Sequence, residues 1–172
     1  MFTTSDIEKY FNGEKQESLL FLFIGIAGIV TALIFFFACK TSFYKGAAVP
    51  LLLIGVMLGV IGYTVYKRSD GDRVRNVYAY GMNPGELKNK ELPRMQKVMQ
   101  HFTVYRYIEI ALLLAGIFLY WYFKDVADKV FWKGLGSTLA IMALLALTAD
   151  YFAAQRGKVY VNGLESFVQQ NH

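Results

Sequence analysis

Three ionisable residues interrupt long apolar stretches of this chain: Arg106, Glu109 and Asp150. A charged side chain in hydrocarbon is costly, so such residues are by default candidates for function. Arg106 and Glu109 are three residues apart, which places them on one face of a helix. Counted from Phe123 and Trp132, Arg106 and Asp150 lie about 26 and 27 Å down their helices at 1.5 Å per residue. We therefore predict one charged cluster.

Two kinds of chemistry fit such a cluster. It could line a cavity open to the cytoplasm and bind an ion, a proton or a small polar ligand. It could instead be a structural ion-pair network that fixes the register of two helices. The sequence has no His/Cys metal spacing, no phosphate-binding glycine loop and no nucleophile elbow. It therefore predicts no enzyme activity, no cofactor and no metal site.

Four apolar stretches must position the charged residues. Each is close to the ~20 residues that cross a bilayer as a helix. They cover residues 19–39, 47–66, 104–123 and 131–153. The sequence thus predicts an all-α polytopic membrane protein, a single domain over residues 1–172 built as a four-transmembrane-helix bundle. Short connections make neighbours of the first and second helices, and of the third and fourth.

Basic residues set the predicted orientation. The N-terminal tail, the loop 67–103 with the start of the third helix, and the tail 154–172 together hold 13 of the 18 lysines and arginines. Cytoplasmic segments carry such an excess, so both termini are predicted to be cytoplasmic, in a bacterial inner membrane. The same rule explains the net charge of +5 and argues against nucleic-acid binding.

The predicted cytoplasmic segments contain short helical extensions. Ser5 and Glu8 fit a capping box, which predicts a short helix lying at the inner membrane interface. Residues 67–72 are polar and turn-like, and the Asn-Pro-Gly sequence at 83–85 is a strong turn signal. The third helix is predicted to begin near Pro93, before it reaches the membrane.

Apolar stripes continue along these extensions. Leu92, Met95 and Met99 recur at helical spacing ahead of the third span, and Leu164 and Phe167 follow the fourth. The stripes could form a surface for a protein partner, or they could only pack on each other.

Small residues mark helix-packing faces. Gly55, Gly59 and Gly62 place a GxxxG pattern on the second span. Such positions let helices approach closely, either within the chain or between copies in a homo-oligomer.

Two functions fit these features of the sequence. The first is a non-catalytic membrane protein that acts by binding another membrane or cytoplasmic protein, as an accessory subunit or an immunity-type protein. The alternative is a small oligomeric channel or transporter that uses the intramembrane charged cluster. Membrane lipid is the expected surrounding in both cases.

Overall fold

The computed structural model describes residues 2–170 as an all-helical chain. Four of its helices are long and apolar enough to cross a membrane. In chain order the elements are α1 (Thr4–Phe37), α2 (Ser42–Met82), α3 (Pro84–Glu86), the π-helical turn η1 (Leu87–Glu91), α4 (Leu92–Phe123), the 3-10 turn η2 (Ala127–Lys129) and α5 (Val130–Gln170).

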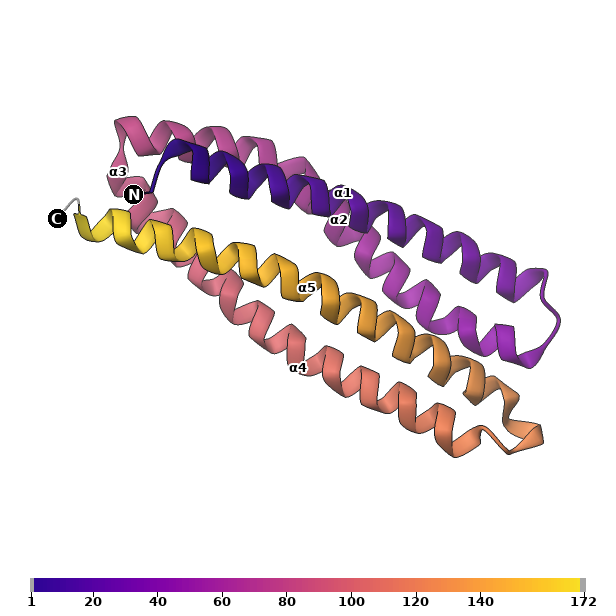
Figure 1. Ribbon diagram of the computed structural model, residues 1–172. Coiled ribbons are helices and arrows are strands. Elements are labelled where there is room, and N and C mark those ends of the chain that lie inside the picture. Colours follow the sequence, from indigo (N-terminus) through magenta and orange to yellow (C-terminus); the bar gives the residue numbers. More distant parts are fainter. Residues whose placement is uncertain (1, 171–172) are drawn as a thin grey trace.

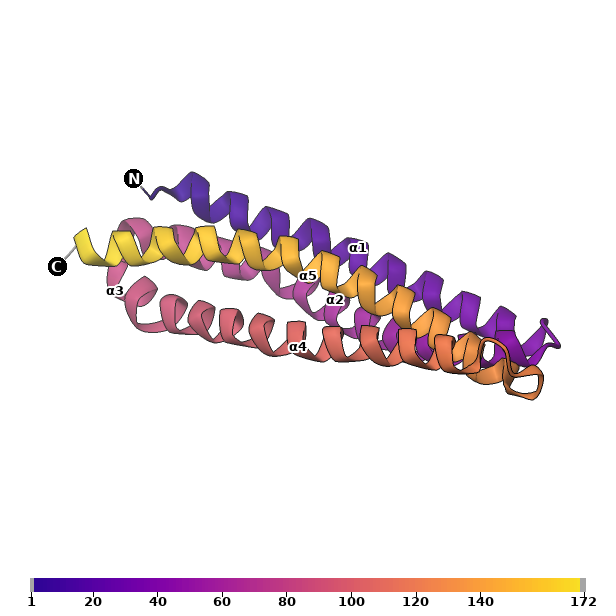
Figure 2. The same cartoon turned by 60° about the horizontal axis from the view of Figure 1, so that its bottom comes forward.

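The long helices run up and down, with α1 antiparallel to α2 and α4 antiparallel to α5 (Figure 1). Both predicted neighbour pairs are confirmed, and α5 also packs on α2, so α5 joins the two pairs. The termini and α3 lie at one end, while the connections between α1 and α2 and between α4 and α5 lie at the other (Figures 1 and 2).

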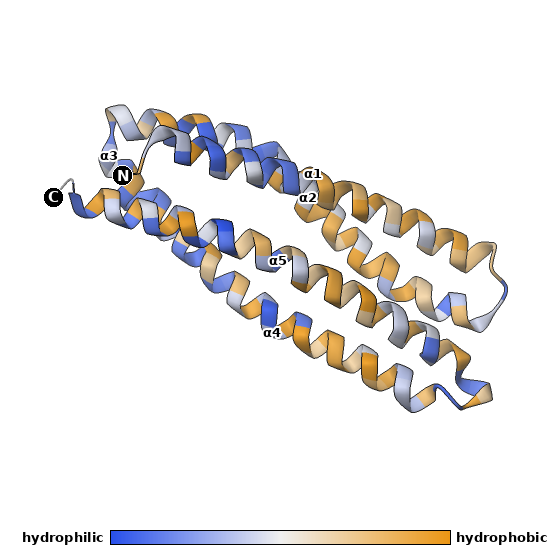
Figure 3. Ribbon diagram, in the orientation of Figure 1, coloured by the Kyte–Doolittle hydropathy of each residue, from blue (hydrophilic) through white to orange (hydrophobic). Residues whose placement is uncertain are grey.

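Hydropathy divides the molecule along its length (Figure 3). We call residues 19–66 and 104–153 the apolar half, and residues 2–18, 67–103 and 154–170 the polar end. The described apolar core cluster lies entirely in the polar end, where Ile7, Leu87 and Leu164 are fully buried. In the apolar half most large apolar side chains point outward instead.

Helical structure in the polar end exceeds the prediction. The predicted short N-terminal helix is wrong, because α1 runs without a break from Thr4 to Phe37. Its capping box is formed by Thr3 and Asp6, not by Ser5 and Glu8. The Thr3 amide and hydroxyl each donate to the Asp6 carboxylate at 2.8 Å.

The first part of the predicted loop 67–103 is wrong, because α2 continues to Met82. The predicted helical start near Pro93 is confirmed, because α4 begins at Leu92. The turn-like residues 67–72 are helical. Charged pairs one turn apart, such as Arg73–Asp70 and Arg75–Asp72, stabilise this part of α2. The predicted turn at 83–85 is confirmed as the end of α2, and α4 begins one residue before Pro93.

Glycines bring the helices of the apolar half into backbone contact. A Cβ added at Gly62 would lie 2.6 Å from the Ser18 carbonyl oxygen of α1, and one at Gly25 would lie 2.6 Å from the amide nitrogen of Gly59. At Gly55 it would lie 3.0 Å from the Gly25 carbonyl oxygen. The predicted glycine pattern on α2 is therefore used within the chain, against α1.

Candidate functional site

The structure brings two of the three predicted charged residues together. Glu109 of α4 and Asp150 of α5 come close enough across the helix pair for their carboxyl groups to interact. The Glu109 Oε2 atom is buried and has no hydrogen-bond partner among the described residues. Arg106 lies one turn from Glu109 on α4 and is exposed. It forms no ion pair with any residue that the structure describes, but its positive charge acts on the Glu109 carboxyl group. The three residues therefore interact without closing into a network of direct ion pairs.

Two facing carboxyl groups can hydrogen-bond only when one of them carries a proton. The pair could therefore hold a proton or a small cation between α4 and α5. The described residues contain no group of three or more His, Cys, Asp or Glu side chains arranged for a metal ion.

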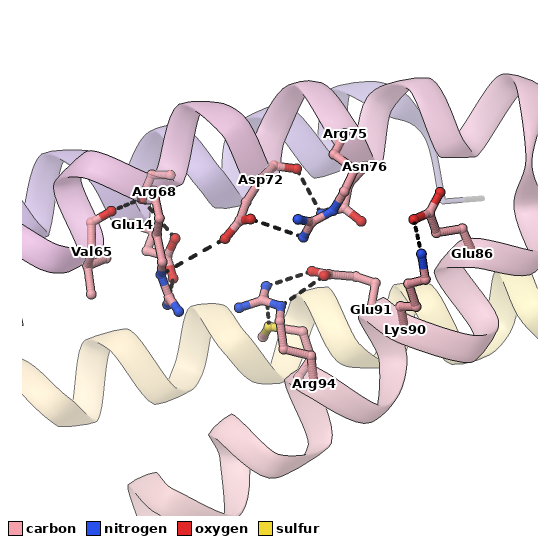
Figure 4. A network of polar contacts seen from close by, with 12 residues as sticks. Glu14, Val65, Arg68, Asp72, Arg75, Asn76, Glu86, Lys90, Glu91 and Arg94 are labelled. Atoms are coloured by element: carbon pink, nitrogen blue, oxygen red, sulfur yellow. Dashed lines mark hydrogen bonds and ion pairs between the residues drawn. The ribbon is translucent and has the colours of Figure 1, made fainter.

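A second polar site, which the sequence reasoning missed, lies inside the core of the polar end. Glu91, on the η1 turn, is only 2% exposed. Arg94 binds it through two hydrogen bonds, from Nε to Oε2 at 2.9 Å and from Nη2 to Oε1 at 2.7 Å (Figure 4). The Tyr160 hydroxyl donates to Glu91 Oε1 at 3.4 Å, so η1, α4 and α5 converge on one carboxylate.

The surroundings of Glu91 shift the titration of its neighbours. Burial raises the pKa of the Tyr160 hydroxyl, and the negative charge of Glu91 raises it further. For Arg94, burial lowers the pKa of the guanidinium, but the hydrogen bonds to Glu91 and the nearby negative charges, Glu91 first among them, together outweigh burial and raise the pKa overall. The charged Arg94 guanidinium and the neutral Tyr160 hydroxyl are thus the stable forms.

A partly buried ion pair ties α1 to α5. Arg156 donates to Glu17 through Nη1 at 2.5 Å and Nη2 at 2.6 Å. Its guanidinium lies 5.9 Å from the centre of the Tyr10 ring, which stacks on Tyr160 with ring centres 4.2 Å apart. The space that Arg156 occupies exists because residue 13 is glycine. A Cβ there would lie 3.0 Å from Arg156 Cδ.

Charged residues also join α1 to α2. The Ser69 hydroxyl donates to Glu14 at 2.9 Å, and Arg68 donates to the same carboxylate at 3.3 Å. Lys15, the next residue along α1, pairs with Asp70, the next residue along α2. Figure 4 shows the Glu14, Arg68 and Asp72 part of this ladder facing the Arg94 guanidinium.

The predicted partner surface lies mostly inside the molecule. Met95 and Leu164 are fully buried, and Leu92, Met99 and Phe167 pack against the same core. Of the two alternatives that the sequence left open, this favours the one in which the stripes pack on each other. The apolar stripes meet each other because all four long helices extend into the polar end and close a core there.

An open groove remains at the polar end, between the N-terminal part of α1 and the C-terminal part of α5. Its volume is about 1010 Å³. Tyr10, Tyr160 and Arg156 contribute to its lining, and Lys9 and Val159 are among its other lining residues. This mixture of aromatic, apolar and charged groups is typical of protein-binding surfaces.

The missed residues carried only a weak signal. Glu91 and Arg94 are three residues apart and flank the stripe at Leu92, but charges in a polar segment are usually solvated. No protein-family model, curated protein or solved structure matches the chain. Its role must therefore be argued from its own residues and geometry.

Proposed function

We propose that this chain is a multi-pass membrane protein that acts by binding another protein at its polar end, not by catalysis. The binding partner would be a membrane or cytoplasmic protein, with this chain as its accessory subunit or as an immunity-type protein. The observation that carries the proposal is the contrast between the two halves: an apolar half with its large side chains outside, and a polar end with a closed core and an open groove.

Burial in the apolar half supports a lipid surrounding. Its helices contact one another through Gly25, Gly62, Gly116 and Gly136, while large side chains such as Leu53 face outward. In water this arrangement would leave most of the apolar surface exposed. The free-energy cost would be roughly 25 cal/mol per Å² of exposed apolar surface. In a bilayer it is the expected one, because helices there associate through small residues and close packing.

The distribution of basic residues supports the proposed orientation of the chain in the membrane. The polar end collects 12 of the 18 basic residues, and Arg106 adds another just inside the apolar half. Cytoplasmic segments hold such an excess, so the polar end is proposed to face the cytoplasm of a bacterium, with both termini inside.

The groove supports a protein partner. It is open along α1 and α5 and combines the exposed Val159 with the charged Lys9 and the partly exposed Arg156. Its floor is rigid, because Tyr10 and Tyr160 are stacked and Arg156 is held by Glu17. A rigid, partly apolar groove lowers the entropy cost of binding a helix or an extended segment.

Affinity purification from native membranes tests this function. Val159→Arg adds a charge inside the groove, whereas Gln169→Arg adds the same charge at an exposed position of α5 that does not line it. A stoichiometric partner should copurify with the unchanged chain and with Gln169→Arg, and be lost with Val159→Arg. A partner that survives Val159→Arg would exclude the groove, and no partner in any sample would contradict the interaction function.

The channel or transporter alternative keeps one specific observation in its favour. Glu109 and Asp150 face each other, and Glu109 Oε2 has no hydrogen-bond partner among the described residues. Arg106 takes no direct part in the pair. Ion or proton flux in proteoliposomes tests the alternative, and flux that is unchanged by Glu109→Gln would remove this residue from it.

A further inference from the structure

The outer face of α2 carries a row of exposed side chains along most of the helix. Its large members are Leu53, Met57, Val60, Val74, Tyr78 and Met82. We call this row the α2 stripe. Between its two halves lie Thr64, Lys67 and Gly71, all exposed, so that from position 53 to position 78 the spacing alternates between four and three residues. This is the spacing of a coiled-coil seam.

The stripe lies opposite the face that packs on α1. That inner face buries Gly55, Gly62, Ser69 and Asn76, one residue in every seven. Because α2 keeps a seven-residue period against α1, its opposite face keeps the same period. A Cβ added at Gly71 would meet nothing within 4 Å, so the centre of the stripe is open.

Contact with membrane lipid explains the exposed apolar side chains only in the first half of the stripe. If the inner boundary lies at Tyr66, then Val74, Tyr78 and Met82 lie about 12, 18 and 24 Å beyond it along the helix. They are 63%, 64% and 75% exposed. The outer face of a helix in water is normally polar, so three large apolar residues in one row indicate a surface that another helix covers.

Charges beside the stripe fit a second copy of the same chain. In a parallel coiled coil, the residue at position g, just before seam position a, lies close to a residue of the partner helix. That partner residue is at position e, five places later in the sequence. Here these residues are Asp70 and Arg75, which carry opposite charges and have about half of each side chain exposed. Two copies inserted in one membrane with the same orientation would also present identical stripes at identical heights, as a two-fold symmetric contact requires.

The central residues of the stripe suit a two-helix seam. Gly71 lets two backbones approach closely, and Lys67 is a polar residue at a seam position. A charged residue at a seam position favours one register at some cost in stability. The two lysines can extend their ammonium groups past the seam into water while their stems stay packed.

We infer that two copies of this chain pair in parallel along the α2 stripe, with Asp70 of each copy facing Arg75 of the other. This inference rests on the proposed membrane insertion with the polar end on one side. It concerns a different face from the groove between α1 and α5. The chain thus has one surface for a second copy of itself, the α2 stripe, and another for its protein partner, the groove.

Cysteine cross-linking in native membranes tests the contact. With Cys39 replaced by serine, Tyr78→Cys places one thiol on the stripe, and Gln100→Cys places one on an exposed face of α4. A short bifunctional maleimide should link the Tyr78→Cys chain into a species of twice its mass and leave the Gln100→Cys chain monomeric. No such species, or a product with a protein of another mass, would overturn the inference.

A charge exchange separates pairing from folding. Asp70→Arg alone and Arg75→Asp alone each place like charges opposite one another, and each should weaken dimerisation about tenfold if two pairs contribute near the upper end of the surface range. The double variant Asp70→Arg with Arg75→Asp should restore it. Within one chain, Asp70 pairs with Lys15 and Arg75 with Asp72, and neither contact is repaired by the exchange.

Recovery in the double variant can therefore come only from contacts between copies, and its absence would count against the seam. Partner capture through the groove should be unchanged in all three variants. In the unchanged chain, absence of the dimer with partner capture intact would contradict the α2 stripe alone. Absence of partner capture with the dimer intact would contradict the groove alone.

Discussion

Glu91 is the residue on which the polar end converges. It is buried, it accepts two hydrogen bonds from Arg94, and it accepts a third from Tyr160. The structure thus satisfies a buried charge with a partner charge and a hydroxyl. One Arg94 atom, Nη1, is buried without a hydrogen-bond partner among the described residues.

Removing one member of this pair should destabilise the protein. Arg94→Met leaves Glu91 buried and unpaired, which should cost about 3 kcal/mol. For a chain of this size that corresponds to a melting temperature lower by about 6–12 °C. Thermal unfolding in detergent, followed by circular dichroism, measures it. Lys90→Met removes only an exposed pair with Glu86 and should leave the melting temperature unchanged.

The double variant Glu91→Leu with Arg94→Met should recover most of that loss, because no unpaired buried charge remains. A double variant as unstable as Arg94→Met would show that the pair itself, not the unpaired charge, stabilises the core.

The raised pKa of the Tyr160 hydroxyl predicts how the stability of the folded protein responds to high pH. Burial raises the pKa of its hydroxyl above the ordinary value of about 10. A group whose folded-state pKa is raised contributes stability that is complete below its unfolded pKa and is lost as pH rises through the folded value. Tyr160→Phe should therefore show a shallower fall in melting temperature above about pH 10. Equal slopes in the two proteins would contradict this account of Tyr160.

At the residue scale the sequence predicted Arg106, Glu109 and Asp150 as candidates, because isolated charges stand out in apolar runs. It did not predict Glu91 or Arg94. A charge in a polar segment gives no sign of burial, and burial here depends on α1 and α5, which are distant in the chain.

At the element scale, glycines decide how closely α1 and α2 approach. A Cβ at Gly62 would lie 2.6 Å from backbone atoms of α1, whereas one at Gly59 would meet nothing within 4 Å. Both glycines lie in the same helix, only three residues apart. Alanine substitutions at Gly62 and Gly59 therefore form a matched pair, one at the contact with α1 and one away from it.

Gly62→Ala should push the two helices apart and cost about 1–3 kcal/mol. Gly59→Ala should be neutral, or stabilising by about 0.5–1 kcal/mol, because alanine is the better helix former. Thermal unfolding of both variants under one condition checks this. Equal effects of the two substitutions would contradict the α1–α2 contact described above.

Helix boundaries were harder to predict than helices. Residues 67–72 are turn-like in sequence, yet α2 continues through them. The reason lies outside the segment: Ser69 donates to Glu14 of α1, and Asp70 pairs with Lys15. A turn signal of single polar residues and one glycine is weak, and contacts with another helix outweighed it. The prolyl turn at 83–85 held because proline lacks an amide donor.

At the scale of the whole molecule, burial is reversed between the two halves. The polar end buries most of its large apolar side chains around one core, with the α2 stripe and Val159 as exceptions, whereas the apolar half exposes most of its own. The sequence predicted the four long apolar helices, because a predominantly apolar run of about 20 residues matches the thickness of a bilayer. It could not predict that all four continue into one ordered polar end, since that depends on which helix faces meet.

Thiol labelling of spheroplasts with a membrane-impermeant maleimide tests the central claim, that the polar end and the connection between α1 and α2 lie on opposite sides of a membrane. Cys39, the only cysteine, lies in that connection. The comparison places a thiol at the exposed Ser166 of the polar end, as Ser166→Cys in a Cys39→Ser chain. The account predicts that Cys39 reacts in intact spheroplasts and that the Ser166→Cys chain reacts only after lysis. The reverse order would invert the topology, and reaction of both in a soluble fraction would contradict membrane insertion itself.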